Sequence, residues 1–323
     1  MAPQGHAHRV LASLDGSQSA LSSVAASWRR CVTVHGLDPE RRAPPHVLSS
    51  AELRQARDGM GAVLPAAQAS LDALFKAVGH AGCCVLLTDA TGAPVDRRGE
   101  AGDDSVFRLW GLWTGVVWSE AAEGTNGVGT CLAEQRPLTI HRDEHFHTKN
   151  IGLSCTVAPI YDPWGRLAGA LDVSSCRAGL GDMVELLRAA VLDAARRIEA
   201  EAFRQTFPHA RLMMLGEPGA RSSTPLLAVD GDDMVVGATH AARKVARLTD
   251  QMIQWGASAS DLMAGPEGAG RSDLVEAERG AVKRALSRAG GSVSAAARDL
   301  GVSRATLHRK MKRLDLHRPS KDV

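Results

Sequence analysis

The chain has 323 residues, of which 44% are hydrophobic and 23% are charged. These proportions are those of an ordinary folded globular protein, and they exclude a disordered chain, a collagen-like chain and a small disulfide scaffold. At about 150 residues per domain, the length predicts roughly two domains. Every apolar run is shorter than the ~18 residues that a membrane-spanning helix needs, and the N-terminus lacks a signal-peptide pattern. We therefore expect a cytoplasmic protein with no membrane partner.

The net charge of +2 hides an asymmetry along the chain. Residues 271–323 hold 13 Lys and Arg against 6 Asp and Glu, a balance of +7. Residues 1–270 hold the other 25 basic residues against 30 acidic ones, a balance of −5. A basic C-terminal domain on an acidic body indicates a nucleic-acid partner, although many basic surfaces are only solvated.

The cysteines show no spacing that indicates a disulfide framework or a redox pair. No two of them form a C-x-x-C motif, and in a cytoplasmic chain this favours reduced thiols. The six are Cys31, Cys83, Cys84, Cys131, Cys155 and Cys176.

The N-terminal half begins with helical signals. Residues 1–48 carry short helical patterns broken by Pro and Gly. In residues 49–78, apolar side chains recur at spacings of three and four, which predicts a helix. We expect Gly59, Gly61 and Pro65 to interrupt it.

The strand signals come next and fix the fold class. Residues 83–88 read as a buried strand, and residues 89–92 as a hairpin turn. Further along, residues 154–161 and 166–173 read as strands joined by the turn 162–165. Strand–turn–strand units mixed with helices predict an α+β sensor fold on an antiparallel sheet.

Residues 182–203 predict a helix with an apolar stripe. Two interpretations stay open: the helix packs on its own sheet, or it forms a dimer seam. The stripe consists of Val184, Leu187, Val191, Ala194 and Ile198.

Residues 205–265 are mixed. Residues 226–237 read as strand, acidic turn and strand, and residues 241–248 as helix, which is enough for a small or degenerate domain. Residues 265–270 read as a linker.

Residues 273–314 predict three helices, of which the last two, 293–300 and about 303–314, are short and joined by a glycine turn. This is the pattern of a helix-turn-helix. Its boundaries follow from capping and turn residues. These are, in chain order, Gly290, Gly291, Ser292, Gly301 and Ser303.

Within the last helix, Leu307 and Met311, with Val302 just before it, are expected to face the core. We expect Arg304 and Thr306 to reach base edges, and the remaining basic side chains to hold phosphates. A plain basic helical hairpin is the alternative. The predicted DNA-binding residues are Ser303, Arg304, Thr306, His308, Arg309, Lys310, Lys312 and Arg313.

The run GGSVSAAARDLGVSRATLHRKMKRLDL closely resembles the Fis-type helix-turn-helix of bacterial enhancer-binding activators. Ser292 stands where that family usually has asparagine, and serine also caps helices. The resemblance implies double-stranded DNA as the partner, bound by a homodimer at a palindromic site.

A second resemblance covers about residues 20–200. This part of the chain resembles the sensor of the acetoin/glycerol-catabolism type of activator, including its GAF domain. The resemblance rests on SWRRC followed by GLDP, and then on WSE, EGTNGVGT, EHF and API through LDVS. Residues 226–248 resemble, more weakly, a PAS-like stretch. The implied organisation is an N-terminal helical segment 1–48, a GAF sensor domain with flanking helices 49–203, a degenerate PAS-like segment and linker 204–265, and a Fis-type helix-turn-helix 271–318.

GAF domains hold small molecules between sheet and loops, so the resemblance implies a small-molecule effector without identifying it. The alternative for Thr125 and Asn126 is that they only close a loop. The implied effector residues are Trp118, Thr125, Asn126, Cys131, His145 and Cys155.

His141, His145, His147 and Cys155 are possible soft-metal ligands, but their spacing matches no standard zinc pattern. The sequence therefore predicts no metal, no cofactor and no catalytic site. A metal or redox sensor is kept as an alternative.

Activators of this type carry a central ATPase, and this chain has only about 70 residues at that place. The sequence of residues 265–272 is close to the motif of a phosphate-binding loop, but Arg271 stands where that motif has lysine. We therefore expect a transcriptional regulator that is not an enzyme and does not remodel polymerase. The alternative is an interaction protein that forms mixed dimers with a full-length activator.

Overall fold

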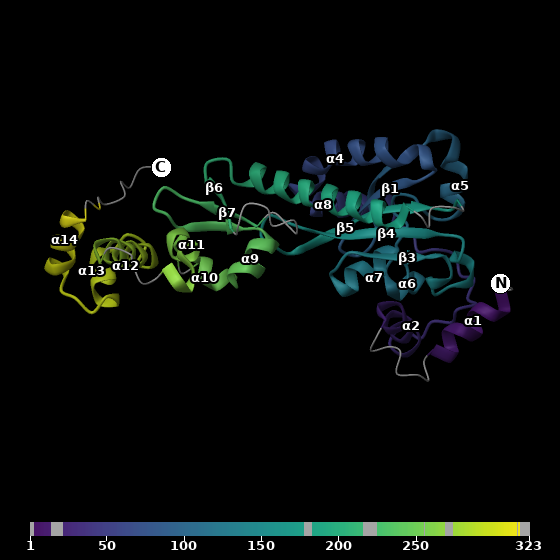
Figure 1. Cartoon of the computed structure of the whole chain (residues 1–323), viewed down its shortest axis with the longest axis horizontal. Coiled ribbons are helices and arrows are strands. Elements are labelled where there is room, and N and C mark those ends of the chain that lie inside the picture. Colours follow the sequence, from purple (N-terminus) through teal and green to yellow (C-terminus); the bar gives the residue numbers. More distant parts are fainter. Residues whose placement is uncertain are drawn as a thin grey trace. The chain divides into compact units, whose positions relative to one another are not determined.

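The computed structural model describes residues 3–13, 22–177, 183–215, 225–254, 256–268, 274–314 and 316. The chain divides into two compact units (Figure 1). The N-terminal unit comprises residues 1–162 and 166–205, and the C-terminal unit comprises residues 163–165 and 206–323. Among the described residues, the helices are all too short or too polar to cross a membrane.

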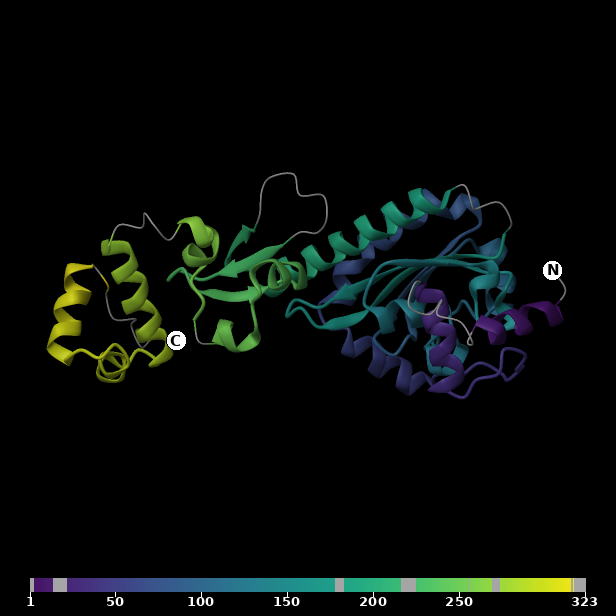
Figure 2. The same ribbon diagram turned by 60° about the horizontal axis from the view of Figure 1, so that its bottom comes forward.

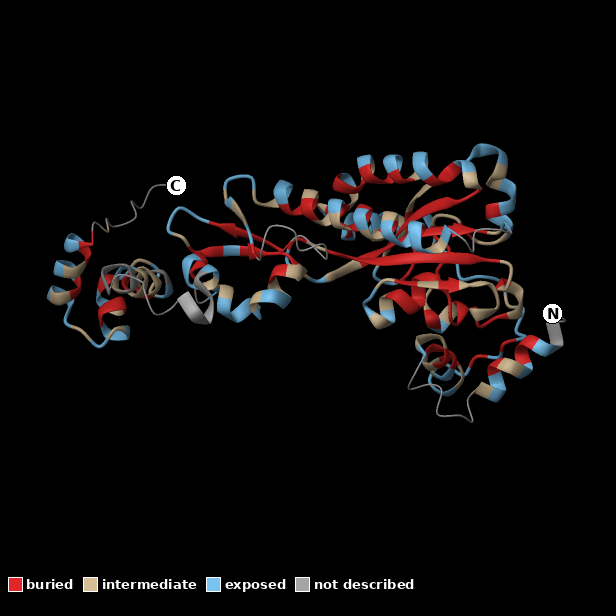
Figure 3. Ribbon diagram, in the orientation of Figure 1, coloured by how far each residue is buried: buried red, intermediate tan, exposed pale blue. Residues whose placement is uncertain are grey.

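A five-stranded antiparallel sheet forms the centre of the N-terminal unit, as the strand signals predict. The strand order is β2-β1-β5-β4-β3. β4 is buried along its whole length (Figure 3). The strands are β1 (Cys84–Asp89), β2 (Pro94–Arg98), β3 (Leu138–His141), β4 (Ser154–Tyr161) and β5 (Leu167–Ser175).

Helices α4 (Val63–Val78) and α8 (Val184–Thr206) cover one face of this sheet; Figure 2 shows α8 as one long helix lying along it. Leu187, Val191 and Ile198 of α8 are buried in the core that α4 and the sheet share. The apolar stripe of α8 therefore packs on its own sheet, the first of the two interpretations.

The predicted interruption of the 49–78 helix is real, but one of its expected causes is wrong. The break lies between α3 (Ser50–Gly59) and α4, where Gly61 has φ +50°. Pro65 does not interrupt the helix, because it lies in the first turn of α4. A proline is tolerated there, since the first-turn N–H groups have no partner within the helix.

The opposite face of the sheet carries α5 (Asp104–Leu109), α6 (Glu120–Glu123) and α7 (Gly127–Glu134). Helices α1 (Pro3–Ala12) and α2 (Ser23–Thr33) pack against this side through a small core that contains Trp28, Cys31 and Phe146. The described part of this unit also holds four 3₁₀ turns, at Gly79–Ala81, Ala101–Asp103, Arg142–Glu144 and Thr148–Asn150.

The C-terminal unit contains a three-stranded antiparallel sheet of order β6-β7-β8. The predicted strand–turn–strand–helix over 226–248 is present. The predicted linker 265–270 is wrong for residues 265–268, which continue a helix; the rest of it lies outside the described residues. The elements are β6 (Arg211–Met214), β7 (Leu226–Val229), β8 (Val235–Ala238), α9 (His240–Ala246), α10 (Asp250–Gln254) and α11 (Ala259–Gly268).

The same unit ends in three helices with a core of their own. They are α12 (Leu274–Arg288), α13 (Val293–Asp299) and α14 (Arg304–Arg313).

Candidate DNA-binding surface and effector pocket

The last three helices form the helix-turn-helix that the sequence predicts. Ser292 Oγ accepts the Ala295 N–H at 3.4 Å, and Ser303 Oγ accepts the Thr306 N–H at 3.1 Å. Gly301, in the turn between α13 and α14, has φ +65°, a conformation that favours glycine. The Ser292 cap sets where α13 begins, and the turn with the Ser303 cap sets where α14 begins.

Helix α14 buries Leu307 and Met311 and turns its polar side chains outward. Arg304, Arg309 and Lys312 are exposed, and no carboxylate of the described chain pairs with them. The other predicted DNA-binding residues lie on the same helix or at its cap, so the structure brings all eight together. Six of them are exposed, while Thr306 and Lys310 are half-buried.

Two of these eight already have an anionic partner. Glu278 of α12 accepts hydrogen bonds from Lys310 on one carboxylate oxygen and from Arg313 on the other. The Lys310 hydrogen bond, with the charges of both cations, holds the pKa of Glu278 below its usual value. Sequence reasoning missed Glu278, because no local pattern links α12 to the far end of α14.

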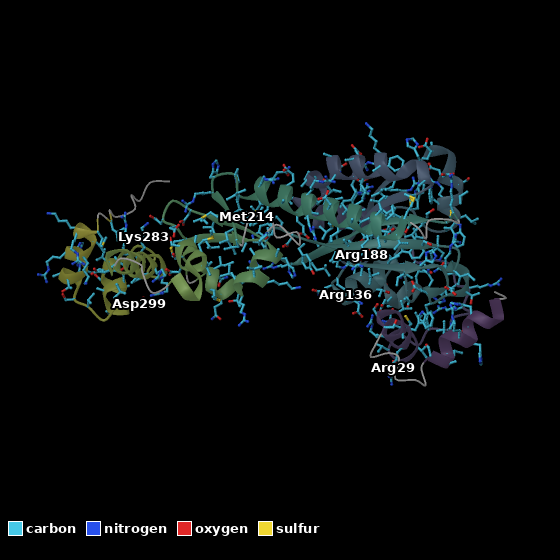
Figure 4. The ribbon with its side chains drawn as sticks, viewed as in Figure 1. Arg29, Arg136, Arg188, Met214, Lys283 and Asp299 are labelled. Atoms are coloured by element: carbon cyan, nitrogen blue, oxygen red, sulfur yellow. The ribbon has the colours of Figure 1, made fainter. Side chains whose placement is uncertain are left out.

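A further ion pair ties α12 to α13. Arg288 Nη2 donates to Asp299 Oδ2 at 2.5 Å, and Figure 4 labels Asp299 on α13. The contacts of α12 with α13 and α14 thus combine an apolar core with charged links at its edge.

In the N-terminal unit, the glycine-rich loop before α7 is closed by its own polar groups. Asn126 Oδ1 accepts the Gly129 N–H at 2.9 Å, and its amide donates to the Gly124 carbonyl at 2.8 Å. Thr125 Oγ1 lies 2.7 Å from Ser27 Oγ of α2. These contacts favour the loop-closing interpretation of both residues.

A partly buried ion pair joins the same region to α2. Arg30 donates two hydrogen bonds of 2.9 Å to the two carboxylate oxygens of Glu120, and a third of 2.7 Å to Glu134. Ser27 Oγ also donates to Glu120, at 2.5 Å. The SWRRC motif therefore fastens α2 to α6 and α7, a role that sequence reasoning did not assign.

His145 and Cys155 meet inside the N-terminal unit. His145 Nδ1 donates to the Arg142 carbonyl at 2.9 Å, and Nε2 lies 3.5 Å from Cys155 Sγ. Burial lowers the pKa of His145 to about 4 and raises the pKa of both the Cys155 and Cys131 thiols. The pair is therefore a neutral imidazole beside a protonated thiol, buried in the core.

The other two histidines of the possible metal set, His141 and His147, make no hydrogen bond to this pair among the described contacts. His141 Nδ1 lies 2.9 Å from Ser154 Oγ, and Cys155 has only His145 among these histidines as a contact within hydrogen-bonding distance. Within the described ranges, no three His, Cys, Asp or Glu side chains are grouped so that they could hold a metal ion.

The N-terminal unit also contains a pocket of about 590 Å³. Its apolar lining comes largely from Trp110, Trp113 and Trp118, and from Ala43, Pro45 and Val47 of the segment between α2 and α3. The segment is held by a bridge between Val47 and Val116. Of the six predicted effector residues, the structure places only Trp118 in this lining; its indole N–H donates to the Gly111 carbonyl.

Comparison with known proteins identifies both parts of the chain. Residues 63–198 match the GAF domain family, and residues 274–314 match the family described as bacterial regulatory protein, Fis family. The acetoin catabolism regulatory protein of Cupriavidus necator is 37% identical over 221 residues, covering 67% of this chain and 33% of that protein.

Two further proteins are similar over a comparable stretch. The acetoin dehydrogenase operon transcriptional activator of Bacillus subtilis is 28% identical, over 67% of this chain and 35% of that protein. The crystal structure of the Escherichia coli DhaR(N)–DhaL complex superposes with a TM-score of 0.52 at 17% identity, over 74% of this chain and 81% of that one, which supports the fold. The chain spans about a third of the length of the two acetoin regulators.

Proposed function

We propose that this chain is a bacterial transcriptional regulator. The proposal is supported because the chain joins a GAF domain to a Fis-family helix-turn-helix and is similar to acetoin regulators. The observation that carries the proposal is α14: a capped helix with an apolar inner side and exposed Arg304, Arg309 and Lys312. Such a helix supplies donors for base edges at its N-terminus and cations for phosphates along its length. Its partner is double-stranded DNA.

The domain roles follow the order of the chain. The N-terminal segment 1–48 and the GAF domain 49–203 form the sensor, the PAS-like segment 204–265 connects, and the helix-turn-helix 271–318 binds DNA as a homodimer. The effector is a small molecule held in the tryptophan-lined pocket, because that pocket has the size and apolar walls of a ligand site. The protein acts in the cytoplasm, where the DNA lies, and has no enzymatic activity or cofactor.

The length of the stretch between the two matched domains helps to decide how the protein regulates transcription. It comprises residues 199–273, 75 in number, and the described part of it holds a small sheet with three short helices. This length does not hold the ATPase that the resemblance implies for such activators. Regulation by DNA binding alone is therefore favoured, and mixed dimers with a full-length activator are the second candidate.

Selection from a random duplex library with the purified full chain tests the proposal. The expected result is an enriched palindromic sequence, bound roughly 10³-fold more tightly than random duplex at about 150 mM salt. An Arg304→Ala variant serves as the control and should enrich a weaker motif. Equal binding of enriched and random duplexes would refute sequence-specific regulation.

A further inference from the structure

The positive and negative charges of the side chains that line the pocket do not cancel. Three of them contribute: Arg108, Glu123 and Lys149. Lys149 Nζ lies 2.7 Å from Glu123 Oε2, so these two charges neutralise each other. Arg108 has no carboxylate partner anywhere in the described residues. The pocket therefore keeps one uncompensated guanidinium in its wall.

Stacking holds this guanidinium in place. The central carbon of Arg108 lies 3.5 Å from the centre of the Trp113 ring. A cation–π contact of this kind holds the guanidinium over the indole while its N–H groups remain available to an acceptor. Arg108 is thus positioned to form the paired hydrogen bonds with which guanidinium groups bind carboxylates.

A second guanidinium, that of Arg97, lies over the same indole. Arg97 lies 4.1 Å from the Trp113 ring centre, and its side chain is only 10% exposed. Arg97 Nη1 lies 2.9 Å from Asp104, but Arg97 Nε and Nη2 are buried and have no hydrogen-bond partner within the described ranges. The ion pair with Asp104 compensates the Arg97 charge, but the two unsatisfied N–H groups favour a hydrogen-bond acceptor in their neighbourhood.

The rest of the lining is apolar and part of it faces solvent. Leu109 is 86% exposed although it lines the pocket beside Trp110. Covering such a side chain removes apolar area from water, which favours a ligand with an apolar body. Trp118 and Pro45 supply further apolar wall.

We propose that this pocket binds a small organic carboxylate, whose carboxylate is held by Arg108 and whose apolar body packs on Trp110, Trp118 and Leu109. The inference rests on the proposed effector-sensing function and adds the chemical class of the effector. The volume of about 590 Å³ is large enough for a carboxylate with an aromatic ring or a branched chain.

Matched acid and amide pairs test the charge requirement. Phenylacetate and butyrate, with phenylacetamide and butyramide as neutral counterparts, are titrated into the full chain by calorimetry and by tryptophan fluorescence. We expect saturable binding of at least one acid, with an affinity at least about tenfold higher than that of its amide. Inorganic phosphate should bind more weakly than that acid, because it lacks an apolar body.

Two variants separate Arg108 from general surface charge. Arg108→Met should reduce acid binding at least about tenfold and leave amide binding unchanged. Arg54→Met is the matched control, because Arg54 is an exposed arginine of α3 outside the pocket lining. Thermal melting of both variants should match that of the parent chain, since both side chains are exposed.

Three results would overturn the inference: an amide that binds as tightly as its acid, an Arg108→Met variant with full acid affinity, or no saturable binding of either acid. The library selection described above gives an independent result. Failure of acid binding with a recovered DNA motif rejects the carboxylate inference alone. Acid binding without any DNA motif rejects the regulator proposal and retains the pocket.

Discussion

Arg304 and Lys312 are both exposed cations of α14, yet they occupy different ends of the helix. Arg304 is the first residue of α14, where recognition helices reach base edges, whereas Lys312 lies near its end, where phosphates are held. Arg304→Ala should cost about 1–3 kcal/mol on the selected sequence and little on random duplex. Lys312→Ala should weaken both duplexes alike and reduce the slope of log affinity against log salt by about 1.

Fluorescence titrations of both variants on both duplexes, at several salt concentrations, make this comparison. The parent chain is the reference, and circular dichroism checks that α14 remains helical. An equal loss on every duplex for Arg304→Ala would assign that residue to phosphate contact instead.

Asp172 is a buried carboxyl group of β5 with incomplete hydrogen bonding. Oδ2 accepts a hydrogen bond of 2.6 Å from Ser174, while Oδ1 has no partner among the described residues. Burial raises the pKa of Asp172 to about 7. Because this folded-state pKa lies above the unfolded-state value, its contribution to stability is full at pH below about 4 and is lost as pH rises through 7.

Asp172→Asn should remove this dependence. Relative to the parent, the variant should gain about 2–4 kcal/mol of unfolding free energy between pH 4 and pH 8. Urea unfolding across that range measures the difference. His145 titrates in the opposite sense, because its lowered pKa makes stability fall as pH decreases from 6.5 towards 4, but this contribution is common to both proteins and cancels. A constant difference across the range would contradict the raised pKa.

Predicting single residues from the sequence succeeded where local geometry decides. Ser292, Gly301 and Ser303 have the capping and turn roles that their types predict. Prediction was weaker for the glycine-rich loop, because tertiary packing also requires its glycines. A Cβ on Gly129 would lie 2.6 Å from the Trp118 carbonyl oxygen, so the position has no room for a side chain. Arg108 was not singled out at all, since only the fold brings it to Trp113 and the pocket.

At the scale of elements, the Glu278 contacts connect α12 with the recognition helix. Glu278→Gln should release Lys310 and Arg313 to bind phosphates, and thereby raise the affinity for random duplex severalfold. The salt slope should steepen by about 1 to 2 for the same reason. Loss of these solvent-exposed ion pairs should change the stability of the fold little.

The control for this prediction is Asp250→Asn, which removes one negative charge from α10, where Asp250 pairs with Arg243. Titration of random duplex compares the two variants. If both change affinity equally, the effect is one of net charge, and Glu278 has no special relation to the recognition helix.

Helices and strands were predictable where the hydrophobic periodicity of the sequence agrees with the positions of its turn-forming residues. The break before α4 and the hairpin of β1 and β2 follow from turn residues. The end of α11 was missed because Gly265 and Pro266 predict a linker, yet the helix continues through them. Glycine and proline lower helix propensity without forbidding a helix, so these two residue types alone did not fix where α11 ends.

At the scale of the whole molecule, the separate hydrophobic cores predict separable functions. The N-terminal unit has its own cores around the sheet, and the helix-turn-helix has another in α12 to α14. The charge balance of +7 lies in residues 271–323, outside the unit that contains the pocket. A chain that ends at residue 268 should therefore keep the pocket and lose the DNA-binding surface.

We expect this shortened chain to bind phenylacetate or butyrate as the full chain does, because all pocket residues lie before residue 151. Its affinity for the selected duplex should fall to the level of a protein without a DNA-binding domain, because the electrostatic contribution of the basic helices is gone. Calorimetry with the acids and titration with labelled duplex measure the two properties on one preparation. Retained DNA affinity would place the DNA-binding surface outside α12 to α14, whereas lost acid binding would show that the pocket depends on the C-terminal helices.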